Sequence, residues 1–142
     1  MITPEIVYVE YPSSFQIDAL SDGIEEFTAP LTGASDRLPL TFLAYAADGT
    51  LLGGISGNTE KGWLYISALW VSEQARRSGL GSRLMHKAEE MAIERGCKSA
   101  YLDTLSCQAP AFYKKLGFVA FAELEAFPGE HTKIFLRKQL QE

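Results

Sequence analysis

The sequence has few residues that could bind a metal or form a cross-link. Only two cysteines and two histidines occur among 142 residues. Cys97 and Cys107 stand without the C-x-x-C or H-x-x-x-H spacing of a zinc site. A chain of this length buries roughly 68–70% of the surface that its unfolded form exposes, so it can fold on a hydrophobic core alone. We therefore expect neither a metal nor a structural disulfide.

Long apolar runs and an excess of basic residues are missing as well. No stretch reaches the ~18 apolar residues that span a bilayer, and residues 1–5 lack the basic flank of a signal peptide. The net charge of −5 and the pI near 5.1 argue against a partner held through a phosphate backbone. The sequence thus predicts a cytoplasmic protein with no membrane and no nucleic-acid partner.

What is present is the composition of one globular domain over residues 1–142. Hydrophobic residues make up 46% and charged residues 22%, and no repeat or low-complexity linker divides the chain. Alternating and helical periodicities predict an α+β fold with a mixed sheet. The expected strands are residues 6–11, 40–47, 51–59, 63–71, 100–104, 118–124 and 132–140. The expected helices run from about residue 13 to 27, from about 80 to 96 and from about 110 to 116. A loop is expected at residues 30–39.

The centre of the chain reads as a strand, a helix and a second strand. Apolar residues recur at Leu84, Ala88 and Met91, close to the period of a helix with one buried stripe, and Gly96 marks its end. Strands 63–71 and 100–104 flank this helix. Such a unit places its two strands in parallel through a right-handed crossover.

The loop before this helix carries two glycines, Gly79 and Gly81, and two arginines, Arg76 and Arg77. The first amides of a helix have no internal partner and sit at the positive end of the helix dipole. A glycine-rich turn at that point is typical of anion-binding sites, above all for pyrophosphate. The same glycines could also serve only to cap the helix.

Two other phosphate-binding motifs fit poorly. A P-loop requires Gly-Lys followed by Ser or Thr, and that triplet is missing from the chain. The dinucleotide fingerprint requires a third glycine where Leu84 stands, and it requires the first glycine directly after the strand. Gly79 follows Val71 by eight positions. A nicotinamide-binding fold is therefore disfavoured.

Two groups of residues together resemble the GNAT family of N-acetyltransferases. The first runs from residues 69–71 through the loop 76–81 to Leu84, and it is similar to that family's acetyl-coenzyme A signature. The second, Ala109, residues 112–113 and residues 116–118, is similar to the family's later A-x-x-x-Y-x-x-x-G-F motif. The resemblance implies a mostly antiparallel sheet of six to seven strands with one central parallel pair that diverges to leave a cleft.

The resemblance also implies the residues that bind acetyl-CoA. Backbone groups near Leu69 and Val71 are expected to pair with the pantetheine arm, and the amides of residues 77–82 to bind the pyrophosphate. The family often has Asn where this chain has Ser106, so that contact is replaced by a hydroxyl or lost. The expected cofactor-binding residues are Leu69, Trp70, Val71, Arg76, Arg77, Ser78, Gly79, Leu80, Gly81, Ser82, Ser106 and Tyr113.

Tyr113 resembles the family's general acid, since a phenol near pKa 10 is protonated at neutral pH and can donate to a departing thiolate. The alternative is that Tyr113 only packs in the core. The base that takes the proton of the amine is not identified by the resemblance. Glu60 and Asp103 are the leading candidates, followed by Glu25, Glu26, Glu130 and His131.

The expected activity is acetyl transfer from acetyl-CoA to a primary amine by direct attack in a ternary complex. The amine could belong to a small molecule, a peptide or a protein. A second hypothesis is a non-catalytic module that binds acyl-CoA as a sensor. A homodimer is also possible, because the final strand could offer an unpaired edge to another subunit.

Overall fold

The computed structural model describes residues 2–142, which form two compact units, residues 2–35 and residues 36–142. Each unit is considered by itself. Residues 36–142 contain the whole sheet and all residues of the predicted acetyl-CoA loop. None of the helices within residues 2–142 has both the length and the apolar character that a bilayer span requires.

The first unit is built around one helix, α1 (Ser14–Thr32). Ser13 caps it: its Oγ accepts a hydrogen bond from the Gln16 amide at 3.1 Å, while Gln16 Oε1 accepts one from the Ser13 amide at 2.9 Å. The helix extends past the predicted end near residue 27 and includes Pro30 in its last turn. The predicted strand at residues 6–11 is wrong, because that segment has no strand structure within its unit. A segment that alternates apolar and polar residues forms a strand only where the edge of a sheet is available for backbone hydrogen bonds.

The second unit contains a six-stranded sheet in the order β1-β2-β3-β4-β6-β5. All neighbours are antiparallel except the central pair β3 and β4, which is parallel. This confirms the predicted α+β class and mixed sheet. The strands are β1 (Leu38–Tyr45), β2 (Leu51–Glu60), β3 (Trp63–Val71), β4 (Ser99–Leu105), β5 (Val119–Leu124) and β6 (Lys133–Gln139).

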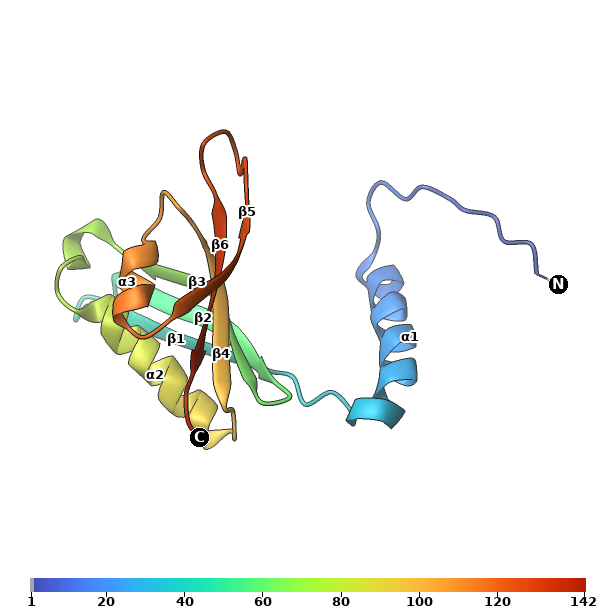
Figure 1. Cartoon of the computed structure of the whole chain (residues 1–142), viewed down its shortest axis with the longest axis horizontal. Helices are drawn as coiled ribbons and strands as arrows, with labels where there is room; N and C mark the ends of the chain where they lie inside the picture. The colour runs from blue at the N-terminus through green and yellow to red at the C-terminus, as the bar shows by residue number, and fades with distance from the viewer. Residues whose placement is uncertain (1) are drawn as a thin grey trace. The chain divides into compact units, whose positions relative to one another are not determined.

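One face of the sheet is covered by helices α2 (Leu80–Glu94) and α3 (Pro110–Lys115) (Figure 1). Met85, Ala88 and Ala92 of α2 are almost fully buried, and they pack against sheet residues such as Leu64 and Leu102. The predicted apolar stripe of the central helix is thus the stripe that faces the core. We call this the helix face of the sheet, and the opposite side the far face.

A bulge in β3 opens the centre of the sheet. Ser56 pairs with Ala68 and Gly57 pairs with Ile66, so Ser67 is an extra residue on β3. A bulge of this kind bends its strand and increases its twist. The parallel ladder to β4 extends only from Trp63 to Ile66, and beyond it the two strands separate. The predicted divergence of the two strands is therefore confirmed.

Candidate functional site

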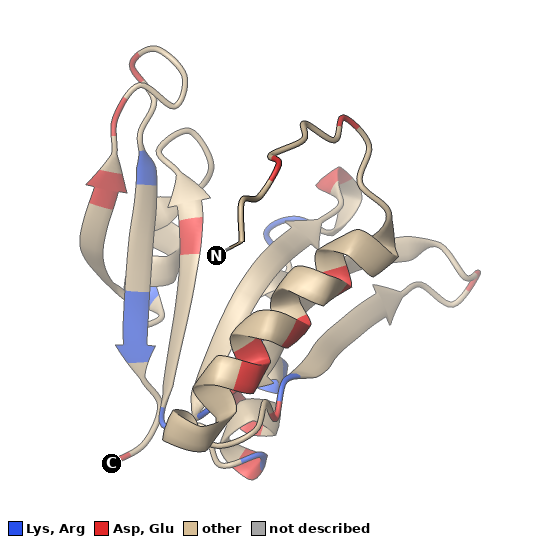
Figure 2. Ribbon diagram, turned by 90° about the vertical axis from the view of Figure 1, so that its right-hand side faces the viewer, with Lys and Arg blue, Asp and Glu red and all other residues tan. Residues whose placement is uncertain are grey.

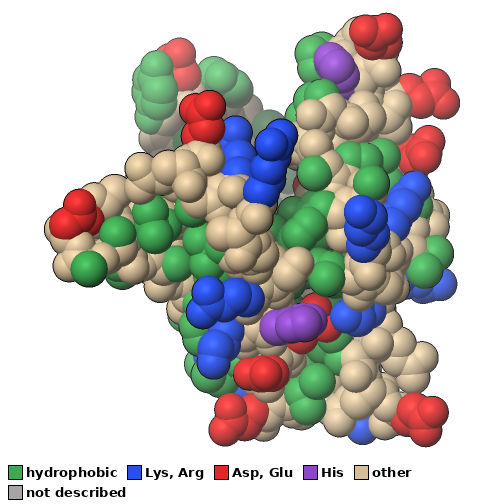
Figure 3. Space-filling model, turned by 90° about the vertical axis from the view of Figure 1, so that its left-hand side faces the viewer, with side chains coloured by type: hydrophobic (Ala, Val, Ile, Leu, Met, Phe, Trp, Pro, Cys, Tyr) green, Lys and Arg blue, Asp and Glu red, His purple; other side chains and the backbone are tan. Residues whose placement is uncertain are grey.

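The separation of β3 and β4 creates a cleft of about 880 Å³. Its walls are the end of β3, the loop before α2, the end of β4 and the start of α3. Figure 3 shows a hollow with apolar side chains and with Lys and Arg side chains nearby. The volume lies in the range of sites that enclose a small organic ligand.

The first wall offers backbone groups of β3 that are not paired with a neighbouring strand. The Ser72 amide donates to Leu52 O on β2 at 2.8 Å, which fixes the side of the strand on which each residue makes its hydrogen bonds. Because these directions alternate along an antiparallel strand, the backbone groups of Val71 and Leu69 point away from β2 and towards the cleft. Pairing with β4 has already ended at Ile66. An extended ligand chain can pair with these groups as an added strand.

The second wall is the loop that leads into α2. Gly79 is the N-cap with φ of 82°, and Arg77 also adopts a left-handed φ of 64°. Because the N-cap residue is a glycine, it has no side chain that could accept a hydrogen bond from the first amides of α2. The first amides of α2 therefore stay available to an anion, and the helix dipole favours negative charge there.

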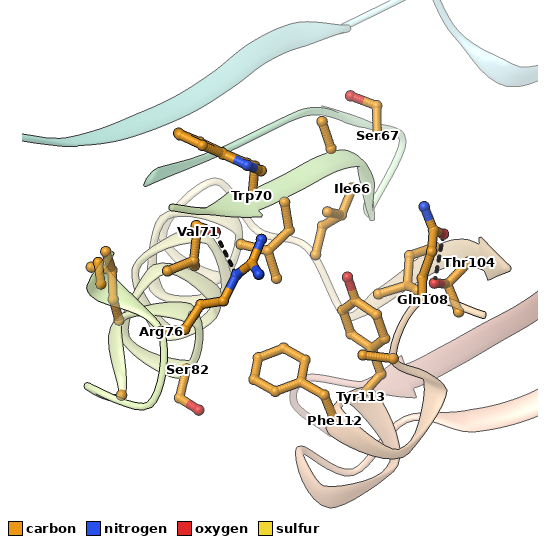
Figure 4. A pocket seen from close by; sticks show the side chains of 18 of the residues that line it. Ile66, Ser67, Trp70, Val71, Arg76, Ser82, Thr104, Gln108, Phe112 and Tyr113 are labelled. Carbon is orange, nitrogen blue, oxygen red and sulfur yellow. Dashed lines mark hydrogen bonds between the residues drawn. The ribbon is translucent and has the colours of Figure 1, made fainter. Parts of the chain in front are cut away.

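The loop also places a cation and an open surface beside these amides. Arg76 Nε donates to Val71 O at 3.3 Å, so its guanidinium is held near the end of β3 (Figure 4). A Cβ atom on Gly81 would stand only 3.2 Å from Phe112 Cζ on the other side of the cleft. Glycine at this position keeps the passage between the loop and α3 open. The amides, the arginine and this gap together fit a diphosphate with a thin chain attached.

The opposite wall presents the Tyr113 phenol. Its ring packs edge-on against Phe112 and Phe118, with ring centroids 5.1 and 6.2 Å apart. Its hydroxyl points into the cleft towards β3 (Figure 4). Burial raises the pKa of Tyr113 above its ordinary value of 10.0, so the phenol stays protonated well into the alkaline range.

Asp103 lies where the cleft meets the far face of the sheet. Its Oδ2 accepts a hydrogen bond from the Tyr65 hydroxyl at 3.1 Å, and Lys133 Nζ stands 3.6 Å from its Oδ1. Burial, followed by this hydrogen bond, raises the pKa of Tyr65. The Asp103 side chain remains 25% exposed. It is thus a positioned carboxylate that a ligand in the cleft can reach.

A family comparison agrees with this geometry. The model of the acetyltransferase (GNAT) family matches residues 5–118. The chain belongs to this family. It is a GNAT acetyltransferase, and the family that the two sequence motifs predict is confirmed.

Individual relatives support the same family. The chain is 40% identical over 93 residues to a blasticidin-S acetyltransferase of Streptomyces morookaense, a match that covers 65% of this chain and 68% of the relative. A crystal structure of an acetyltransferase from Agrobacterium tumefaciens aligns with a TM-score of 0.88 at 29% identity, covering 96% of this chain and 99% of the other. A structure from Bacillus anthracis, solved with acetyl coenzyme A, aligns with a TM-score of 0.63 at 22% identity over 71% of this chain and 62% of its own, and shares the fold.

Most of the residues predicted to contact the cofactor in this acetyltransferase line the cleft. Ser78 and Ser106 do not. Ser78 Oγ donates to Ala75 O and so closes the turn before α2. Ser106 Oγ accepts from the Thr132 amide at 2.9 Å, and its own amide donates to Thr132 O at 2.8 Å. Both serines stabilise loops that border the site. The lining residues from the prediction are Leu69, Trp70, Val71, Arg76, Arg77, Gly79, Leu80, Gly81, Ser82 and Tyr113.

The two leading base candidates fall in different places. Asp103 lines the cleft, whereas Glu60 does not. Glu60 pairs with Trp63 at the start of β3, before the strands separate at Ile66. Glu130 and His131 lie between β5 and β6, and neither lines the cleft. Glu25 and Glu26 belong to α1 in the other unit.

Gln108 is a cleft residue that the sequence reasoning missed. Its Oε1 accepts hydrogen bonds from the Leu105 amide at 2.8 Å and from Thr104 Oγ1 at 3.0 Å (Figure 4). Because an amide nitrogen can only donate, the Leu105 contact identifies the side-chain oxygen and leaves Nε2 as a donor at the cleft. The signal in the sequence was a carboxamide only two positions after Ser106, where the family often has Asn.

Proposed function

We propose that this acetyltransferase transfers the acetyl group of acetyl-CoA to the primary amine of a small cationic molecule, by direct attack within a ternary complex. The observation that carries the proposal is the shared cleft. The free amides at the α2 N-terminus, the open edge of β3 and the Tyr113 hydroxyl all border one cavity. The structure with acetyl coenzyme A from Bacillus anthracis supports the same use of the fold.

Different residues of this chain would bind the two halves of the cofactor. The amides of residues 79–82 and the charge of Arg76 or Arg77 would bind the diphosphate, since several amides and a guanidinium act together on one anion. The backbone of Leu69 and Val71 would hold the pantetheine chain. Gln108 Nε2 adds one more donor on the facing wall. Acetyl-CoA supplies the acetyl group as a thioester when bound there.

Tyr113 would act as the general acid. Its raised pKa means that the phenol carries its proton at neutral pH. As the new carbon–nitrogen bond forms and the carbon–sulfur bond breaks, the neutral phenol can donate that proton to sulfur, and the phenolate can regain one from the acylated nitrogen. A proton donor positioned in this way contributes about 10²–10⁴-fold to the rate of such reactions.

Asp103 would receive the proton of the amine, directly or through a water molecule. An alkylamine with a pKa near 10.4 is protonated at neutral pH, so its nitrogen is a nucleophile only after it loses a proton. Asp103 carries a negative charge that attracts an ammonium group, and it borders the cleft where strands β3 and β4 have separated. Tyr65 and Lys133 hold its two oxygens in place.

One relative and the net charge of the chain both favour a small cationic amine as the acceptor. The blasticidin-S acetyltransferase of Streptomyces morookaense is named for a small-molecule substrate. The net charge of −5 would also attract a small cationic amine. A peptide or protein amine remains a second class of acceptor to be compared with it.

The test is a screen of primary amines for acetyl-CoA-dependent release of free thiol. The panel should contain blasticidin S, simple diamines, a lysine-containing peptide and a protein N-terminal peptide. We expect turnover with one or more small cationic amines, with acetylated product confirmed by mass spectrometry. Tight binding of acetyl-CoA with no turnover on any amine would instead support a non-catalytic acyl-CoA sensor.

A further inference from the structure

Helix α1 carries an apolar stripe that its own unit leaves exposed. The stripe recurs at intervals of three and four residues, which places its members on one side of a helix. None of the residues that the structure describes in α1 is buried. The opposite side is acidic, with Asp18, Asp22, Glu25 and Glu26 (Figure 2). The stripe consists of Ile17, Leu20, Ile24, Phe27 and Leu31, which are 47–75% exposed.

The far face of the sheet in the other unit is also apolar and exposed. Side chains alternate between the two faces of a strand, so the neighbours of buried Leu64 and Ala100 point to the far face. Trp63 and Tyr101 stand there, with ring centroids 5.7 Å apart. Exposed large residues of this face include Leu43, Trp63, Trp70, Tyr101 and Phe121.

We propose that α1 of one copy of this chain covers the far face of a second copy, and that α1 of the second copy covers the far face of the first. The interface would then consist of two equivalent helix-on-sheet contacts related by a twofold axis. Each contact removes one exposed apolar stripe and one exposed aromatic face from water. The proposal concerns assembly and is independent of the proposed activity.

The size of the two surfaces fits a stable dimer. Burying an aliphatic or aromatic side chain of this size removes roughly 60–120 Å² of surface from water. With five side chains in each stripe, and with both partners and both copies counted, the exchange would cover on the order of 1,200–2,400 Å². Stable, specific protein interfaces fall in this range.

The junction between the units favours a second copy over the same chain as the occupant. The Ser35 amide donates to Glu25 Oε1 on α1 at 2.7 Å. The next residue, Asp36, accepts a hydrogen bond from the Lys61 amide on the β2–β3 turn at 2.8 Å through Oδ1. Adjacent residues thus make hydrogen bonds within different units, and only residues 33–37 connect α1 to β1. Short hinges of this kind favour exchange between copies over closure within one chain.

The first test is the mass of the full-length protein in solution, measured by light scattering on a size-exclusion column at micromolar concentration. The proposal predicts twice the chain mass of 15.7 kDa. A monomer at this concentration would overturn it, because α1 would then have to cover its own sheet or remain exposed.

Two variants then locate the contact. Ile24→Lys places a charge in the apolar stripe, and Asp22→Lys places the same residue on the acidic side of the same helix as the matched control. Tyr101→Lys places a charge on the far face. We expect Ile24→Lys and Tyr101→Lys to shift the dimer to monomer by at least tenfold in dissociation constant, and Asp22→Lys to remain dimeric.

Mixing the two disruptive variants provides the sharpest result. A mixed dimer keeps one intact contact, between the unaltered α1 of the Tyr101→Lys chain and the unaltered sheet of the Ile24→Lys chain. We therefore expect the mixture to dimerise more tightly than either variant alone. A dimer that tolerates Tyr101→Lys, or a mixture without this gain, would overturn the proposal in favour of a helix-to-helix or other interface. If Tyr101→Lys loses its native circular dichroism spectrum, Trp63→Lys replaces it.

Discussion

Tyr113 packs in the core through its ring and borders the cleft through its hydroxyl. Its ring contacts Phe112 and Phe118, which belong to the same layer as the core, while its hydroxyl points into the cleft. Burial of the ring raises the pKa of the phenol. A residue in this position can serve the core and donate a proton at once, so packing and catalysis are not exclusive alternatives here.

Replacing Tyr113 by Phe separates these two roles. The variant keeps the ring and removes the proton donor, so we expect kcat to fall by about 10²-fold or more. The dissociation constant for CoA, measured by isothermal titration calorimetry, should change by less than about threefold. Tyr45→Phe removes an exposed hydroxyl from β1 and should leave both quantities unchanged. An unchanged kcat in Tyr113→Phe would refute the role of general acid.

The raised pKa of Tyr113 also predicts how stability depends on pH. The neutral phenol is favoured in the folded state, so its contribution is fully present below the unfolded pKa near 10 and is lost as the pH rises through the folded pKa. Urea unfolding of the native protein should therefore lose more free energy between about pH 9 and pH 11 than unfolding of Tyr113→Phe. Equal losses in the two proteins would contradict the burial of this phenol.

At the level of elements, the glycine-rich loop before α2 and α2 itself could be predicted because their signals are local. Gly79, Gly81 and the apolar period that begins at Leu84 lie within a few residues of one another. The Asp48-Gly49 turn between the predicted strands 40–47 and 51–59 is a local signal too, and β1 pairs with β2 across it. Signals within such short spacings do not depend on how the rest of the chain folds.

The elements that sequence reasoning missed depend on distant partners. Residues 6–11 alternate like a strand, yet a strand forms only beside a free sheet edge. The bulge at Ser67 depends on the register between β2 and β3, and Gly57 permits it because a Cβ at that position would overlap the Tyr65 carbonyl. Ser106 and Gln108 likewise depend on their neighbours in space: Thr132 engages the first, and Thr104 and the Leu105 amide orient the second.

The passage beside the α2 N-terminus is tested by Gly81→Trp. A Cβ at Gly81 already approaches Phe112 closely, so an indole must occupy the space between the loop and α3. We expect CoA affinity to fall by at least 100-fold in a calorimetric titration. Lys87→Trp introduces the same side chain on the exposed side of α2 and should bind CoA normally. Normal affinity in Gly81→Trp would show that the ligand passes elsewhere.

At the scale of the whole molecule, charge is expected to guide the acceptor. The chain carries 18 acidic and 13 basic residues, and Asp103 adds a negative group at the cleft itself. An excess of one charge raises the local concentration of ligands of the opposite charge. The basic residues of the loop, Arg76 and Arg77, would serve the anionic cofactor at the other end of the same cleft.

This separation of charge predicts a salt dependence. Raising ionic strength from about 0.05 to 0.5 M shortens the screening length severalfold, so kcat/KM for a cationic amine should fall several-fold at saturating acetyl-CoA. The kcat/KM for an aromatic amine that is neutral at the assay pH should fall much less. The same decline for both acceptors would show that attraction of the cation does not contribute.

The central claim is that the amides ahead of α2 bind the diphosphate of acetyl-CoA. The most direct measurement is a titration of ¹⁵N-labelled protein with CoA, followed by amide chemical shifts, with pantetheine as the matched ligand that lacks the diphosphate and nucleotide. CoA should produce its largest shifts at Gly79, Leu80, Gly81 and Ser82, and pantetheine should leave those four amides nearly unmoved. Shifts confined to other parts of the chain, or no shift at millimolar CoA, would contradict the account.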